Sequence, residues 1–253
     1  MTTLDLTPAV GAAPAGRRVL SHGLLETRLL VRNGEQLLLA LVIPVAILVG
    51  GRVLGGPSGD LATLAPSVLG LAIWSTAFTS VAISTGFERR YGVLERLATT
   101  PLGRTGLLLG KCAAVTVVVV GQLIILGATA VALGWRPTVT LPAALAALAT
   151  GLLAGATFVA LALLTAARLR AEVTLAVANL VYVVMLAGGA LLVPLVRYPE
   201  AIRPVVELLP TAALGEGLRS AALGQPLGWP FLVLLGWLVL AGLLVRKGFR
   251  WIS

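Results

Sequence analysis

The sequence predicts an all-α polytopic membrane protein with six transmembrane helices. Hydrophobic residues make up 58% of its 253 positions, charged residues only 11%, and the mean hydropathy is +1.01. A soluble domain of this length needs far more charge to cover its surface. Six apolar runs have the length of roughly 17–25 residues that crosses a bilayer. They cover residues 37–54, 67–86, 112–133, 141–167, 173–195 and 229–245.

The first 36 residues contain no continuous apolar core, so we expect no signal peptide there. Because the first apolar run starts at residue 37, the chain divides into an N-terminal tail, residues 1–36, and a six-span membrane domain, residues 37–253. Pro44 interrupts the first run, where a kink is tolerated if neighbouring groups satisfy the freed carbonyl.

The distribution of Lys and Arg predicts the orientation. With six spans, fourteen of these side chains fall on one side of the membrane and five on the other. The richer side holds Arg17, Arg18, Arg28, Arg32, Arg89, Arg90, Arg96, Arg104, Lys111, Arg168, Arg170, Arg246, Lys247 and Arg250. Because cytoplasmic loops retain Lys and Arg, both termini and residues 87–111 are expected in the cytoplasm. The same bias explains the pI near 11.2, so no nucleic-acid partner is expected.

The spans carry no ionisable residue away from their ends, which argues against proton relays, ion-coupled transport and intramembrane hydrolysis. Gln122 and Asn179 are the strongest polar groups left, and we interpret both as interhelical hydrogen-bond partners. Hydroxyl side chains recur along the second span, either lining a translocation path or packing on a neighbouring helix, and packing is favoured. No catalytic residue is predicted. No metal site is predicted either, since His22 has no Cys or His partner nearby.

Residues 87–111 form a charged, amphipathic insert between the second and third spans. On a helical wheel one narrow stripe gathers Phe87, Tyr91, Leu94 and Ala98. Glu88 and Glu95 flank this stripe on one side, and Arg89 and Arg96 lie on the opposite face. Pro101 ends the helix, because proline disfavours helix in the residue before it. We expect one surface helix that buries its stripe in the membrane and shows both signs of charge to the cytoplasm.

Two alternatives for this insert lose support. A pure lipid anchor would favour unmixed positive charge. A phosphate loop needs Gly, four residues, then Gly-Lys-Ser/Thr after a strand. Here Thr105 replaces the first glycine and Cys112 the hydroxyl residue, and a membrane span follows. The insert is therefore no nucleotide site, and no cofactor is expected in this chain.

The residues of the insert and the order of the spans resemble those of a known family. Residues 88–97 read Glu-Arg-Arg-Tyr-Gly-Val-Leu-Glu-Arg-Leu, and Thr100-Pro101 and Gly110-Lys111 follow. This pattern resembles the cytoplasmic signature of ABC type-2 transporter permeases, with Val93 where threonine is common. The six-span order extends the resemblance over nearly the whole chain.

The resemblance implies roles for particular segments. Residues 87–98 would be a coupling helix that meets a separate ATP-binding subunit, and the loop near residue 170 a smaller second contact. The coupling residues would be Glu88, Arg89, Arg90, Tyr91, Gly92, Glu95, Arg96, Arg168, Arg170 and Glu172. Residues 20–36 would form an amphipathic interface helix containing Arg28, Arg32 and Asn33. Residues 205–223, broken by prolines, would form short external helices, an external re-entrant segment with Pro210, Thr211, Glu216 and Arg219.

The function so implied is the permease subunit of an exporter, with ATP and Mg²⁺ held by the partner and no enzyme activity in this chain. Expected partners are two copies of the ATP-binding subunit, a second permease as homodimer or heterodimer, and membrane lipids. A path without charged ligands favours an amphiphilic drug, lipid or lipid-linked glycan. The expected location is a bacterial plasma membrane. Two alternatives stay open: a non-transporting membrane assembly factor, and an ATPase-independent carrier or channel.

Overall fold

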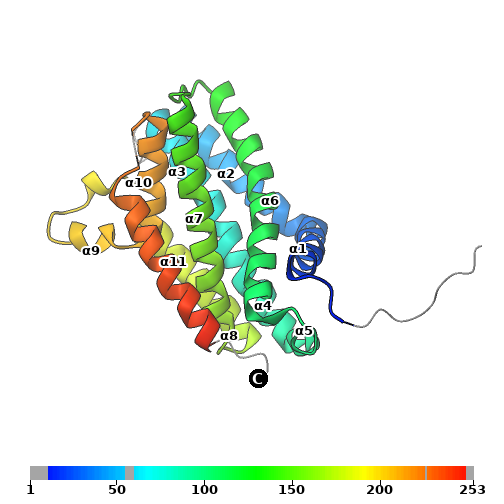
Figure 1. Ribbon diagram of the computed structural model, residues 1–253. Helices are drawn as coiled ribbons and strands as arrows, with labels where there is room; N and C mark the ends of the chain where they lie inside the picture. Colours follow the sequence, from blue (N-terminus) through cyan, green and yellow to red (C-terminus); the bar gives the residue numbers. More distant parts are fainter. Residues whose placement is uncertain (1–10, 55–59, 226, 249–253) are drawn as a thin grey trace, which may run out of the picture.

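The computed structural model describes residues 11–54, 60–225 and 227–248, and every regular element in these ranges is a helix (Figure 1). The elements are α1 (Ala15–Arg32), α2 (Gly34–Leu54), α3 (Leu61–Trp74), the π-helix η1 (Ser75–Ser80), α4 (Val81–Arg90), α5 (Val93–Ala98), α6 (Gly103–Ala132), α7 (Leu141–Ala166), α8 (Ala171–Gly188), the 3-10 helix η2 (Leu195–Arg197), α9 (Arg203–Glu207), α10 (Pro210–Ala222) and α11 (Trp229–Gly248). The start of the predicted tail, residues 1–10, and Arg250 lie outside the described residues. The predicted all-α class is confirmed for the described part.

Five helices in the described ranges are long and apolar enough to cross a membrane. They are Leu61–Arg90, which joins α3, η1 and α4, then Gly103–Ala132, Leu141–Ala166, Ala171–Gly188 and Trp229–Lys247. These correspond to the second to sixth predicted spans. The apolar part of α2, Ala40–Leu54, is shorter. At 1.5 Å per residue it reaches about 22 Å, so the predicted six-span count stays a prediction.

Several helix ends differ from the predicted boundaries. The second span starts at Leu61 because the Asp60 carboxylate accepts a hydrogen bond from the Thr63 amide at 3.0 Å and so caps the helix. The third starts at Gly103 rather than residue 112 and carries Lys111 inside its first turns. The fifth ends at Gly188 rather than residue 195, and Ala190 then takes a left-handed backbone with φ of +51°.

The helix formed by α3, η1 and α4 is the most buried of the five and lies at the centre of the bundle. Its Trp74 stacks on Phe78 with ring centroids 4.4 Å apart, and Phe158 of α7 meets Trp74 edge-on at 4.7 Å. Aromatic contacts of this kind add to the packing that holds helices together where no water is displaced. The interhelical role predicted for Gln122 is confirmed, since its side-chain oxygen accepts a bond from the Thr76 hydroxyl at 2.9 Å.

The two ends of the bundle carry different groups. At the lower end in Figure 1, α5, the start of α8 and the end of α11 gather, and Arg104 donates to the carbonyl of Arg246 at 2.9 Å. We call this the basic end, since it holds the arginines of the insert and of the α7–α8 loop. At the opposite, far end, Arg52 of α2 donates to the carbonyl of Leu133.

Residues 205–223, predicted to form short external helices as a re-entrant segment, include the whole of α10. This helix packs inside the bundle against α3, α7 and α11, and most of its residues are buried (Figure 1). Glycines make this close packing possible. A Cβ on Gly217 would lie 2.7 Å from Thr150 Cγ2 of α7, and one on Gly70 of α3 would lie 3.5 Å from Leu214 Cγ and Leu218 Cδ1 of α10. The prolines do divide the segment into short pieces, as predicted.

Candidate coupling surface and the ion cluster behind it

The two predicted docking segments lie together at the basic end. Arg90, the last residue of α4, pairs with Glu172 in the first turn of α8. Arg89 donates to the carbonyls of Ala166 at 3.2 Å and Leu169 at 3.5 Å, at the end of α7 and in the following loop. The side chains of Arg168 and Arg170 are exposed in the same loop. A groove of about 370 Å³ lies between these segments, and we call it the basic groove; among its lining residues are Arg89, Arg90, Glu95, Arg170 and Glu172.

The predicted single helix over residues 87–98 is wrong. Gly92 has φ of +69°, a left-handed conformation that glycine adopts without strain, and it separates α4 from α5. The stripe is therefore split. Leu94 is completely buried in the protein core, whereas Tyr91 is 68% exposed and its ring stacks on Phe87. The charged pair on α5, Glu95 and Arg96, is exposed, as expected for a docking surface.

Glu88 lies elsewhere than predicted, because its side chain points into the protein. Its Oε1 accepts a hydrogen bond from Lys111 Nζ at 2.8 Å, and the same ammonium donates to Glu26 Oε2 of α1 at 3.0 Å. Lys111 is only 2% exposed. These residues and His22, whose Nε2 lies 3.5 Å from Glu26 Oε1, form what we call the buried ion cluster.

The buried ion cluster joins three helices. Glu26 belongs to α1, Glu88 to α4 and Lys111 to α6. The helices α1 and α6 cross closely because Gly110 has no side chain: a Cβ there would lie 2.4 Å from His22 Cδ2. Burial lowers the pKa of His22 below its usual value, and the positive charge of Lys111 acts in the same direction against the opposing charge of Glu88. The side chains of Glu26 and Glu88 thus share the Lys111 ammonium in the interior.

Sequence reasoning missed this cluster, since its members are 85 and 23 residues apart along the chain. One signal was present: Lys111 is one of only two lysines in a chain whose other basic residues, apart from His22, are arginines. Lys at the inner end of an apolar helix needs a partner when it is buried. Within the described residues no group of three or more His, Cys, Asp or Glu could hold a metal ion.

The predicted interface helix is present with different ends. It begins at Ala15 and stops at Arg32, and Asn33 separates it from α2, so it does not continue to residue 36. One face packs on α6 (Figure 1). The other face exposes apolar side chains; they are Leu20, Leu24, Leu25 and Leu29. Arg28, Arg32 and Asn33 are also exposed. This mixture of apolar and basic side chains is typical of a helix at a membrane surface.

A second groove lies between α2, the continuous α3–η1–α4 helix and α8, and we call it the central groove. Its volume is about 300 Å³, and it is lined by Ala40, Ile43, Pro44, Leu71, Ser75, Thr79, Ser80, Ile83, Asn179 and Tyr182. The π-helix η1 supplies three of these polar residues, and such helices occur frequently at functional sites. The hydroxyls of the second span therefore divide: Thr76 bonds Gln122, whereas Ser75 and Thr79 line the groove.

The predicted residues of the 205–223 segment lie at the start and along the length of α10. Pro210 and Thr211 form its first turn and are buried. Arg219 is also buried, and its Nη1 and Nη2 donate to the Ser67 hydroxyl of α3 and to two carbonyls of the stretch that follows α8. Glu216 pairs with Arg219 at 2.9 Å and accepts a bond from the Leu195 amide at 2.7 Å. These two charges therefore serve the interior rather than an external surface.

The membrane-length helices, the charged surface at one end and the central groove define the membrane subunit of a transporter. The model of the ABC-2 family transporter proteins matches residues 35–246, and the chain belongs to this family. Similar proteins include the probable doxorubicin resistance ABC transporter permease protein DrrC from two strains of Mycobacterium tuberculosis, CDC 1551 / Oshkosh and ATCC 25618 / H37Rv. Each is 30% identical over 249 residues, which cover 92% of this chain and 89% of the relative. Membership implies an ATP-binding subunit as partner.

Proposed function

We infer that this chain is the permease subunit of an ATP-driven exporter, coupled through residues 88–96 and 168–172 to a separate ATP-binding subunit. The observation that carries this proposal is the continuity from surface to interior. Arg89 and Arg90 join α4 to the α7–α8 segment. The preceding residue, Glu88, binds Lys111 inside the protein. A force applied at the basic groove therefore reaches α1 and α6 through adjacent residues of one helix.

The proposed topology has six spans, with α2 as the first, and both termini in the cytoplasm. The gathering of arginines at the basic end supports this orientation, because cytoplasmic segments retain basic residues. The α1 helix would lie at the inner membrane surface with its exposed leucines in the lipid.

In the proposed cycle, ATP binding brings two ATP-binding subunits together and moves α4 and α5 with them. The ATP and its Mg²⁺ belong to those subunits, and this chain supplies path and transmission without chemistry of its own. Glu95 and Arg96 would contact the ATP-binding subunit, since both are exposed on α5. The buried ion cluster would carry the movement to α1 and α6.

The central groove is the proposed substrate path. Its lining combines apolar side chains with uncharged hydroxyl and amide groups, which suits an amphiphilic cargo such as a drug, a lipid or a lipid-linked glycan. The relatives' name includes doxorubicin resistance, which favours the drug. The α8 helix exposes Leu180, Val183 and Val184 close to the groove residue Asn179. A second permease subunit, identical or different, would cover this face and close the path.

Co-purification tests this proposal. The chain, expressed with its ATP-binding subunit, should retain that subunit in detergent, and candidate cargo should stimulate ATP hydrolysis in proteoliposomes. Glu95→Lys should abolish the stimulation without loss of membrane insertion, because Glu95 is exposed on α5. Glu207→Lys, a same-charge change on α9, is the matched control. Unchanged cargo-stimulated hydrolysis in the Glu95 variant would refute the coupling surface. A chain that never retains an ATP-binding subunit would instead favour a carrier or an assembly factor.

A further inference from the structure

Arg219 holds together segments that are far apart in the chain. Its Nη1 donates to Ser67 Oγ of α3 at 2.7 Å and to the Leu191 carbonyl at 2.9 Å. Its Nη2 donates to the Ala190 carbonyl at 2.8 Å and to Glu216 Oε1 at 2.9 Å. The residue is only 7% exposed. Hydrogen bonds from a buried charged donor are among the strong ones in proteins.

The segments that Arg219 joins continue two of the three walls of the central groove, the third being α2. Ser67 lies one turn before Leu71, the first groove residue on the α3–η1 wall. Ala190 and Leu191 follow the end of α8, whose Asn179 and Tyr182 form the opposite wall. One guanidinium therefore ties both walls together between the groove and the far end of the bundle. A hydrogen bond also joins α10 to the far end: the carbonyl of Ala222, its last residue, accepts from the Thr138 amide of the α6–α7 loop at 2.9 Å.

Two further observations indicate that this tie is made to open. Ala190 has φ of +51°, a left-handed conformation that a residue with a Cβ rarely adopts and that surrounding contacts must hold in place. The contacts that hold it are the Arg219 bond to its carbonyl and the Tyr198 hydroxyl, which accepts from its amide at 3.1 Å. Release of Arg219 would therefore let the end of α8 relax.

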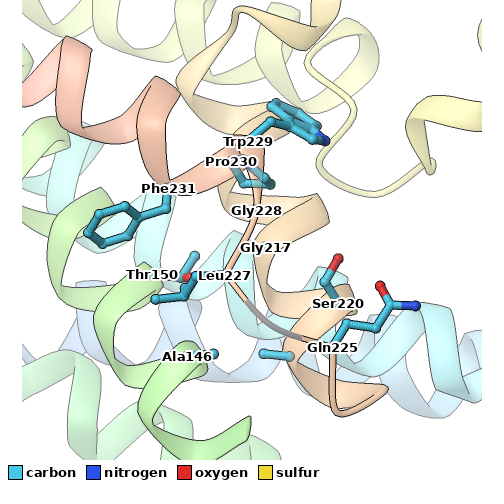
Figure 2. A pocket seen from close by; sticks show the side chains of 11 residues that line it. Ala146, Thr150, Gly217, Ser220, Gln225, Leu227, Gly228, Trp229, Pro230 and Phe231 are labelled. Carbon is cyan, nitrogen blue, oxygen red and sulfur yellow. The ribbon is translucent and has the colours of Figure 1, made fainter. Parts of the chain in front are cut away.

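Space for movement lies beside α10. A cavity of about 310 Å³ lies between α7, α10 and α11, and Figure 2 shows Thr150, Ser220 and Phe231 around it. Ala221, which lines this cavity, and Arg219 are two positions apart, about 200° around the helix. The cavity and the bonds of Arg219 thus lie on opposite faces of α10. At Gly217 the helix already contacts Thr150 of α7, so the unfilled volume lies beside the last turn of α10, on the side away from the groove walls.

We propose that Arg219 is a positioning residue that latches the far end of the central groove, with Ser67, Glu216 and the Ala190 and Leu191 carbonyls as its partners. In the latched state the two walls are joined and the groove is closed toward the far end. Breaking the bonds to Ser67 and to the α8 end lets the last turn of α10 withdraw toward the cavity and opens the groove. This proposal rests on the proposed function in taking the central groove as the path and the far end as the outer side.

Cysteine accessibility tests the latch. Cys112 is replaced by Ala, and Thr79→Cys places a reporter in the groove. Intact cells are treated with a membrane-impermeant maleimide from outside, without any demand on transport. Arg219→Gln should raise the labelling rate of this reporter about tenfold or more, since it removes several charge-assisted hydrogen bonds. Ser67→Ala, which leaves the arginine in place, should raise it less but in the same direction.

The matched control is Arg203→Gln. Arg203 of α9 also donates to backbone carbonyls, those of Val196 and Tyr198, but it joins the 195–207 segment only to itself. Its replacement should leave labelling unchanged. Equal labelling of the parent and the Ser67 variant would overturn the latch even if the Arg219 variant failed to insert. An equal rise in the Arg203 variant would also overturn it. Because labelling needs no ATP-binding subunit, its result stands apart from the co-purification test of function.

Discussion

At the scale of single residues, Lys111 is the most informative side chain. A lysine that is 2% exposed must be paired, and it binds one carboxylate from α1 and another from α4. Such buried pairs contribute little net stability when complete but cost much when one partner is lost. Their value here is positional, since Lys111 fixes α1 and α4 relative to α6.

Lys111→Met should destabilise the protein by about 3–5 kcal/mol, because it leaves Glu26 and Glu88 buried without a counter-charge. Thermal unfolding in detergent, followed by tryptophan fluorescence, measures the loss. Lys247→Met, a change at the other lysine, which is exposed, should leave unfolding unaltered. Adding Glu88→Gln to the Lys111 variant should restore part of the stability. If both lysine variants unfold like the parent, the cluster does not hold these helices together.

At the scale of elements, the crossing of α1 over α6 depends on glycine. His22 and Gly23 lie directly against Gly110, so the two helices approach more closely than any larger residue would permit. Small residues at such crossings are how helices pack within membranes. Glycines also let α10 pack inside the bundle: Gly217 of α10 lies against α7, and Gly70 of α3 lies against α10.

Gly110→Ala should separate α1 from α6 and weaken the buried ion cluster, since the new Cβ would lie 2.4 Å from His22 Cδ2. We expect a loss of about 1–3 kcal/mol, as for other overpacked sites. The control is Gly121→Ala in the same helix, where nothing lies within 4 Å of the added Cβ. That change should be neutral or slightly stabilising. Equal melting temperatures for the two variants would contradict the tight crossing.

The sequence predicted the elements better than their contacts. Apolar length was enough to find the five long spans, and the charged insert marked the basic end. A helical wheel assumes an unbroken helix, so it could not reveal that Gly92 splits residues 87–98 or that Glu88 turns inward. The partners of Glu88 and Arg219 come from distant segments, which no local pattern contains. The burial of α10 likewise depends on which helices its glycines meet.

At the scale of the whole molecule, one chain of contacts leads from the basic end to the far end. The basic groove meets α4, α4 continues through η1 into α3, and α3 reaches the Arg219 latch through Ser67. The central groove lies along this continuous helix. A permease that moves in response to an ATP-binding subunit needs a connection of this kind.

The most direct test of this account is ATP-dependent cargo uptake into inside-out vesicles that contain the chain and its ATP-binding subunit. Arg90→Glu breaks the pair with Glu172 that joins α4 to α8. It should reduce uptake about tenfold or more, and the charge swap Arg90→Glu with Glu172→Arg should restore most of it, because the pair is re-formed. If uptake is unchanged in the single variant, coupling does not pass through this surface. Uptake that is equally low in the charge swap would instead contradict a role for the Arg90–Glu172 pair itself.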